Sequence, residues 1–150
     1  RVLFEMNHAT RGGALHVGFG SVARIEQSTF LRNSATISGG ALQVDGGQVH
    51  MLNGTRFEAN SAPSSAGSSI YFASAGWLNY TLPAPPGRWL FLRQGSTFQL
   101  EPGAEDADFP YACPAGVVGG DGAAPADQSG PQCKGLCPSG RLCPIATVQP

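Results

Sequence analysis

Apolar residues alternate with polar or small residues over short stretches in the first half of the chain. Leu15 and Val17 flank His16, and Leu42 and Val44 flank Gln43. This two-residue period is typical of a half-buried β-strand and not of an amphipathic helix. Glycines interrupt the alternation every few residues, so the pattern predicts short strands separated by turns.

The alternating stretches belong to a repeat of 27 residues. Aligning residues 12–38 with residues 39–65 gives 12 identities in 27 positions. Partial copies flank the two full ones: FEMN ends at Asn7, and GSSIYF ends at Phe72 with one residue inserted. Such a unit cannot bury its apolar face alone, so we expect each copy to stack on the next.

Stacking predicts that each strand pairs in parallel with its equivalent in the next copy, about 4.8 Å away. Leu15 would then lie over Leu42, and Phe30 over Phe57. The predicted fold is all-β, a short parallel β-helix. We expect two kinds of corner residue: glycine pairs where a side chain would meet the next coil, and asparagines that tolerate left-handed backbone and bond across coils. These residues are Gly12, Gly13, Gly39 and Gly40, and Asn7, Asn33 and Asn60.

The stretch GGAL, followed by FLRN or FEAN, resembles the GGA(I/L/V) and FxxN repeats of chlamydial polymorphic outer-membrane proteins. The resemblance covers residues 4–72 and implies a right-handed, pectin-lyase-like β-helix of about three coils. It is fairly specific for the fold and much less so for an activity. The third copy has Ser68 and Ser69 in place of the second glycine and the alanine, so we expect an irregular last coil.

A different pattern follows Phe72. Residues 77–82, WLNYTL, predict one more strand, and the prolines of residues 83–87 exclude a central strand because they lack a backbone donor. We expect residues 77–100 to cover the last coil. Trp77, Trp89 and Phe91 would be buried there; the alternative is an exposed aromatic platform for sugars. The predicted organisation is β-helix repeats over residues 1–82, a capping or linker segment over 83–109 and an incomplete cysteine-rich module over 110–150.

All four cysteines lie in the last quarter of the chain: Cys113, Cys133, Cys137 and Cys143. The surrounding C-P-x-G pattern resembles the ephrin-receptor-like cysteine-rich modules of large surface proteins, including those of algae and other unicellular eukaryotes. A segment so poor in apolar residues needs covalent cross-links, which predicts disulfide bonds in an oxidising compartment. Four cysteines allow three connectivities, which the sequence does not distinguish. Zinc is the less favoured alternative, because Cys113 stands far from Cys133.

Charge and hydropathy exclude two classes of partner. The formal net charge is −1, and the basic residues are scattered, so a nucleic-acid surface is not expected. The chain has no apolar run of about 20 residues that could span a bilayer.

Because the chain begins without methionine inside a repeat, we expect a fragment of a longer protein. The sequons at Asn53 and Asn79 are glycosylation candidates and agree with secretion.

Candidate chemical groups do not converge in the predicted stack. Polysaccharide cleavage needs carboxylates close together, whereas no two of the repeat's four acids share a column between neighbouring full coils. The three histidines have no equivalents in other copies, so we expect solvated or packed side chains and no metal or cofactor. We interpret the acidic run near residue 105 as a solvated turn, with calcium as the alternative. The acids are Glu5, Glu26, Asp45 and Glu58, the histidines His8, His16 and His50, and the run contains Glu101, Glu105, Asp106 and Asp108.

The sequence therefore predicts a non-enzymatic fragment of an extracellular or cell-surface protein. Its role would be structural, adhesive or ligand-displaying, with protein or glycan ligands on the outer faces and any membrane anchor outside the fragment. The alternative is part of a carbohydrate-active β-helix enzyme, a polysaccharide lyase or hydrolase, whose catalytic coils lie elsewhere.

Overall fold

The chain folds into short strands joined by tight turns. The computed structural model describes residues 1–63, 66–73, 76–90 and 108–149, and within them the chain is all-β, with one short 3₁₀ helix and no α-helix. The elements are β1 (Leu3–Glu5), β2 (His8–Arg11), β3 (Leu15–Val17), β4 (Val22–Glu26), β5 (Thr29–Leu31), β6 (Ser34–Ser38), β7 (Leu42–Val44), β8 (Gln48–Leu52), β9 (Arg56–Glu58), β10 (Ile70–Phe72), β11 (Trp77–Thr81), β12 (Arg88–Trp89), β13 (Tyr111–Ala112), β14 (Val117–Val118), the 3₁₀ helix η2 (Pro125–Gln128) and β15 (Gly135–Leu136).

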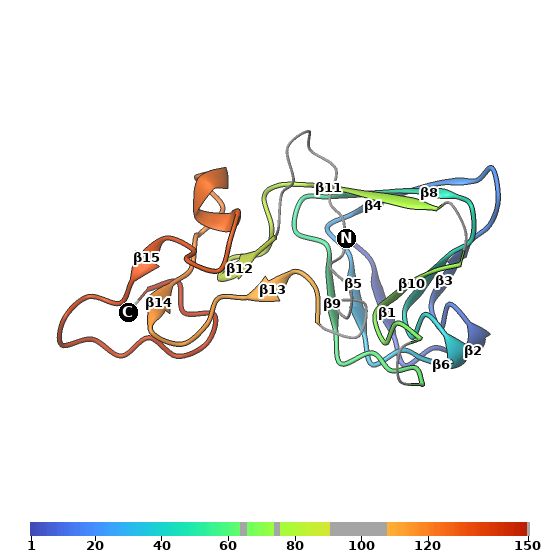
Figure 1. Cartoon of the computed structure of the whole chain (residues 1–150), viewed down its shortest axis with the longest axis horizontal. Helices are drawn as coiled ribbons and strands as arrows, with labels where there is room; N and C mark the ends of the chain where they lie inside the picture. The colour runs from blue at the N-terminus through green and yellow to red at the C-terminus, as the bar shows by residue number, and fades with distance from the viewer. Residues whose placement is uncertain (64–65, 74–75, 91–107, 150) are drawn as a thin grey trace.

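Three parallel sheets each take one strand from three successive copies of the repeat. Their strand orders are β1-β5-β9, β3-β7-β10 and β4-β8-β11. Figure 1 shows these sheets as the sides of a roughly triangular cross-section, with β2 and β6 at one corner. Leu15 pairs with Leu42, and Phe30 with Phe57, as the 27-residue alignment predicts. Leu42 pairs in turn with Ile70, which accommodates the inserted residue of the third copy.

The sheet of β4 and β8 departs from the predicted register by one residue. Ile25 pairs with Met51 and Glu26 with Leu52, where the alignment predicted Leu52 and Asn53. A slip of one residue exchanges the two faces of a strand, and this register places the buried Ile25 and Met51 side by side in the interior. The shift of one residue arises in the preceding corner, because residues 18–21 join β3 to β4, whereas the shorter segment 45–47 joins β7 to β8.

Stacked phenylalanines form one column of the core. The rings of Phe4 and Phe30 lie 4.6 Å apart at 8°, and those of Phe30 and Phe57 lie 4.5 Å apart at 6°. Phe109 closes the column: it is fully buried, its ring lies 6.3 Å from that of Phe57, and the two backbones exchange hydrogen bonds. The ring of Phe109 also contacts that of Tyr80 edge-on, with the two ring centroids 5.5 Å apart.

An asparagine ladder runs along the corner that follows the phenylalanine strands. Oδ1 of the fully buried Asn33 accepts hydrogen bonds from the backbone N–H of Asn7 (3.0 Å) and from its Nδ2 (2.9 Å). Nδ2 of Asn33 donates to the carbonyl oxygen of Phe4 (2.9 Å) and to Oδ1 of Asn60 (3.0 Å). The predicted cross-strand bonding of these asparagines is therefore present.

The sequence predicted left-handed backbone at the asparagines of this corner. The left-handed residue is instead the one before each asparagine. Met6, Arg32 and Ala59 have φ of 54°, 53° and 51°. The asparagine is constrained by its side-chain bonds to the neighbouring copy, so the turn falls on the preceding residue. Asparagine thus supplies the hydrogen bonds, and other residues carry the backbone strain.

The two glycines of each pair serve different purposes. Gly12 and Gly39 have φ of 59° and 65°, which favours glycine. A Cβ on Gly13 would collide with the carbonyl oxygen of Gly40, and a Cβ on Gly40 would collide with that of Ser68. The second glycine therefore permits the close approach of successive copies.

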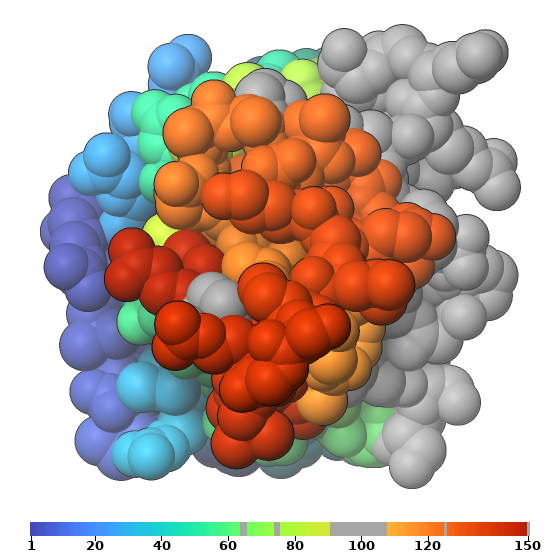
Figure 2. All heavy atoms as spheres, turned by 90° about the vertical axis from the view of Figure 1, so that its left-hand side faces the viewer, coloured from blue at the N-terminus to red at the C-terminus, as the bar shows by residue number. Residues whose placement is uncertain are grey.

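The C-terminal segment lies beside the β1-β5-β9 sheet. Figure 1 shows β12 to β15 to one side of the repeats, and in Figure 2 the residues from 108 onward, in orange and red, lie in front of them. Arg88 on β12 bridges to the repeats through a 2.7 Å ion pair with Glu58. Buried Gln128 accepts from the N–H of Ala84 (3.0 Å) and donates to its carbonyl (2.9 Å).

All four cysteines form disulfide bonds, as predicted. Cys113 pairs with Cys133 and Cys137 with Cys143, which selects one of the three connectivities that the sequence left open. The described residues include no helix that is long and apolar enough to cross a membrane.

Candidate functional site

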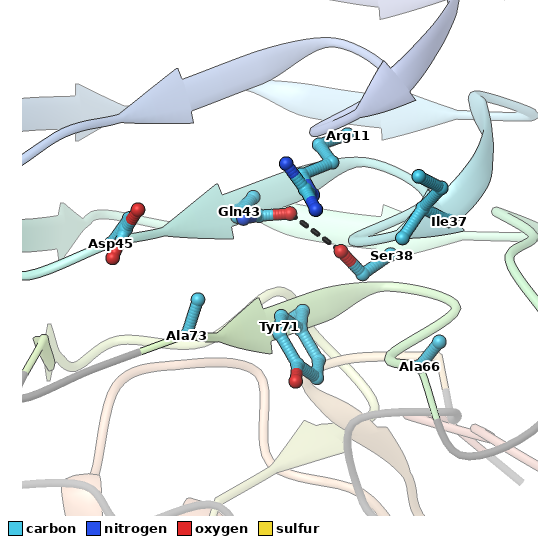
Figure 3. Close-up of a pocket in the computed structure, with 8 residues that line it drawn as sticks. All are labelled: Arg11, Ile37, Ser38, Gln43, Asp45, Ala66, Tyr71 and Ala73. Carbon is cyan, nitrogen blue, oxygen red and sulfur yellow. Dashed lines mark hydrogen bonds between the residues drawn. The ribbon is translucent and has the colours of Figure 1, made fainter.

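A polar groove runs along the outer face of the β3-β7-β10 sheet (Figure 3). Strand alternation turns the middle residue of each strand outward, so His16, Gln43 and Tyr71 share one row across the sheet. Neighbouring turns extend this row into a groove of about 410 Å³. It is lined by Arg11, Ile37, Ser38, Gln43, Asp45, Ala66, Tyr71 and Ala73.

The floor of the groove is formed by the side-chain amide of Gln43 and the hydroxyl of Ser38, which are hydrogen-bonded to each other. Gln43 and Ser38 are 2% and 4% exposed, and the Ser38 hydroxyl donates to Oε1 of Gln43 at 2.7 Å. This bond restricts rotation of the Gln43 amide. A preorganised polar group loses less entropy when a ligand binds.

Charged and aromatic groups surround this floor. Figure 3 shows Arg11 and Tyr71 on either side of Gln43, with Asp45 at the far end near Ala73. Within the described part of the chain Arg11 forms no ion pair. The groove thus offers a cation, a phenol ring and a carboxylate around a fixed amide, a set that can bind a polar ligand with one flat apolar face.

The other acids of the repeats are engaged elsewhere. Glu58 pairs with Arg88 at 2.7 Å and Arg56 at 3.7 Å, and Glu26 accepts a 2.6 Å hydrogen bond from Nδ2 of Asn53. Asp45 is the one carboxylate among the described residues that line the groove. General acid and base catalysis of glycoside cleavage uses a pair of carboxylates, which these lining residues do not supply.

Glu5 lies near Arg32, at 4.0 Å. In the acidic run, Asp108 is exposed and accepts a 2.7 Å hydrogen bond from the backbone N–H of Ala59, which attaches its segment to the last full repeat. The other acids of the run, Glu101, Glu105 and Asp106, lie outside the described residues. Among the residues that the structure describes, no three histidine, cysteine, aspartate or glutamate side chains are grouped so that they could hold a metal ion.

The three histidines lie on different sheets. His8 hydrogen-bonds the Ser34 hydroxyl at 2.8 Å, His16 is exposed on β3, and His50 contacts Trp77 edge-on with ring centroids 4.9 Å apart. The fold does not bring them together.

Trp77 is the clearest departure from the predicted cap. It is 38% exposed, because β11 extends the β4-β8 sheet and its inward positions are taken by Leu78 and Tyr80. Trp89 is buried as expected, but against Tyr111 and not over the phenylalanine column. Phe91 lies outside the described residues. Phe109 closes the column; it lies outside residues 77–100, which were expected to cover the last coil, but within the predicted capping or linker segment 83–109.

The two sequons have different surroundings. Asn53 is exposed and donates to Glu26, while its Thr55 is buried, with Oγ1 donating to the carbonyl of Leu52 at 3.0 Å. Asn79 lies on the outer face of β11, and its Oδ1 is buried and has no partner among the described residues. A buried acceptor without a donor costs about 1–3 kcal/mol.

Comparisons of the chain with protein-family models, with curated proteins and with solved structures found no match. Function is therefore inferred from the residues and their geometry.

Sequence reasoning missed the groove. A signal was present, because Gln43 pairs with Tyr71 and Arg11 with Ser38, so these residues are equivalents in successive copies. Their outward positions follow from strand alternation, but only the neighbouring turns reveal that the surface is concave.

Proposed function

We propose that this chain is a non-enzymatic part of an extracellular or cell-surface protein that displays a ligand-binding surface. The carrying observation is the combination, in one chain, of repeat copies stacked in parallel with a disulfide-bonded segment of few regular elements. Stacked repeats provide long outer faces for contact, and disulfides persist in oxidising compartments.

In this proposal the repeats form a short right-handed parallel β-helix like that of the chlamydial polymorphic outer-membrane proteins. The cysteine-rich segment is an ephrin-receptor-like module. The proposed parts are the repeats over residues 1–82, a capping or linker segment over 83–109 and the cysteine-rich module over 110–150. Burial of Ala84 and Phe109 in the core supports a covering role for the middle segment.

The groove on the β3-β7-β10 sheet is the proposed ligand site. Its fixed Gln43 amide, the half-buried Tyr71 and Arg11, which forms no ion pair with a described residue, suit binding of a protein or glycan segment. With Asp45 as the one carboxylate among the described lining residues, binding without turnover is the expected behaviour.

The test uses the chain secreted from eukaryotic cells behind a cleavable leader, labelled, and applied to glycan arrays, protein arrays and cell surfaces. We expect Arg11→Ala and Tyr71→Ala each to weaken binding at least about tenfold, which corresponds to about 1.4 kcal/mol. Arg24→Ala is the matched control, because Arg24 is exposed on the outer face of a different sheet.

Three results would contradict the proposal. Equal binding by wild type and both groove variants would exclude the groove. Release of reducing sugar by the wild type but not by Asp45→Asn would show an enzyme. Retention inside the cell with free thiols would exclude an extracellular protein.

A further inference from the structure

Strand β11 presents a complete sequon on its outer face. Its burial alternates, with Trp77, Asn79 and Thr81 outward and with Leu78 and Tyr80 inward at 3% and 2% exposure. Residues two apart on a strand share a face and lie about 6.6 Å apart. The acceptor asparagine, the sequon threonine and a tryptophan thus stand in one outward line.

The Asn79 amide is oriented in a defined way. Its Oδ1 is buried and has no hydrogen-bond partner among the described residues, so bonding within the sheet does not account for an asparagine here. Asn79 as a whole is only partly buried, and Nδ2 is not among the described side-chain atoms that are buried without a partner. Nδ2 is the atom to which an N-linked sugar is attached.

Trp77 lies next to this position. Its ring contacts His50 edge-on, with centroids 4.9 Å apart and planes at 84°, and His50 is the cross-strand partner of Asn79. The indole therefore leans toward the row that contains Asn79 while staying 38% exposed. An exposed aromatic face beside Nδ2 can pack against the apolar face of a sugar ring.

The other sequon is already accounted for by the fold. Nδ2 of Asn53 donates to Glu26 at 2.6 Å, and Thr55 is fully buried with its hydroxyl bonded to the Leu52 carbonyl. A sugar on Asn53 would replace one proton of this donor. A sugar on Asn53 would therefore alter an existing hydrogen-bond donor, whereas Asn79 makes no such bond among the described residues.

We propose that Asn79 is an N-glycosylation site whose first sugar packs on Trp77, an inference that rests on the proposed extracellular location. The donor is an oligosaccharide linked to a polyprenyl pyrophosphate. A bond forms between Nδ2 and the anomeric carbon of the first sugar, the bond from that carbon to the pyrophosphate oxygen breaks, the amide loses one proton and the polyprenyl pyrophosphate leaves.

The experiment compares variants secreted from a eukaryotic host, all in an Asn53→Gln background. Peptide mass spectrometry after peptide-N-glycosidase digestion reports occupancy, and melting temperature is measured before and after sugar removal. We expect occupied Asn79 and a glycan-dependent gain of about 2–4 °C. Trp77→Ala should lose at least half of the gain, Trp77→Phe should keep most of it, and Phe19→Ala should keep all of it, because Phe19 is 91% exposed in a different turn.

Unmodified Asn79 in secreted protein with both disulfides formed would overturn the inference and leave the proposed function intact. An equal glycan-dependent gain in wild type and Trp77→Ala would overturn the role of Trp77. Failure of the wild type to be secreted, or secretion with free thiols, would count against the proposed function instead.

Discussion

Replacing Asn33 by alanine tests whether the asparagine ladder stabilises the stack. The substitution removes four side-chain hydrogen bonds, two accepted from Asn7 and two donated to Phe4 and Asn60. A buried hydrogen bond contributes about 1 kcal/mol net, so the expected loss of unfolding free energy is about 4 kcal/mol. For a chain of this size that is a fall in melting temperature of about 8–16 °C.

Two further variants make this test specific. Asn7→Ala removes one side-chain bond at the exposed end of the ladder and should cost about 0.5–1 kcal/mol. Asn33→Asp keeps the size of the side chain and its accepting oxygen but cannot donate to the Phe4 carbonyl at neutral pH. It should therefore be at least as destabilising as Asn33→Ala.

Urea denaturation of the oxidised protein, followed by circular dichroism and tryptophan fluorescence, measures all three variants. With a slope of about 2 kcal/mol per molar urea, the midpoint of Asn33→Ala should fall by about 2 M. A midpoint for Asn33→Ala within about 0.5 M of that for Asn7→Ala would refute a stabilising ladder.

Three other predictions follow from the described contacts. Gly40→Ala should destabilise by about 2 kcal/mol or more, because the new Cβ meets the Ser68 carbonyl, whereas Gly18→Ala, with open space around it, should change the thermal midpoint little. Replacing the two cysteines of the disulfide that spans 20 residues should cost about 3 kcal/mol, against about 2 kcal/mol for the disulfide that spans 6 residues, because the longer loop restricts the unfolded chain more; equal urea midpoints would contradict this. Burial raises the pKa of Tyr80 above its ordinary value of 10.0, so the unfolded chain ionises first and stability should be lost as pH rises beyond about 10. Tyr80→Phe should remove that part of the loss, as urea midpoints against pH would show, and an unchanged slope would contradict it.

The parallel pairing could be predicted from the sequence because chemically distinctive residues repeat at a fixed interval. Phe30 and Phe57 could face each other only if the copies stacked in parallel, and they do. The register of β4 against β8 could not be predicted in this way. There the two copies differ by one residue in the preceding corner, and the choice of which face points inward is made by the burial of Ile25 and Met51.

The candidate site was predictable only in part. The sequence indicated that the acids of the repeats would not share a column, and it left exposed aromatic residues as an alternative to burial. It did not reveal that Trp77 faces outward, since that depends on β11 joining the sheet of β8. The groove between Arg11 and Tyr71 depends on turns from three copies meeting at one surface.

The sequence by itself determined the short strands, the interval at which they stack and the need for cross-links in the last quarter of the chain. These follow from local alternation, repetition and composition, which act over a few residues or recur at fixed spacing. The tertiary structure alone decided which cysteines pair, that Phe109 closes the phenylalanine column and that Gln43 lies at the floor of a groove. Each of these joins residues whose separation has no period, so it depends on the path of the whole chain and not on any pattern within it.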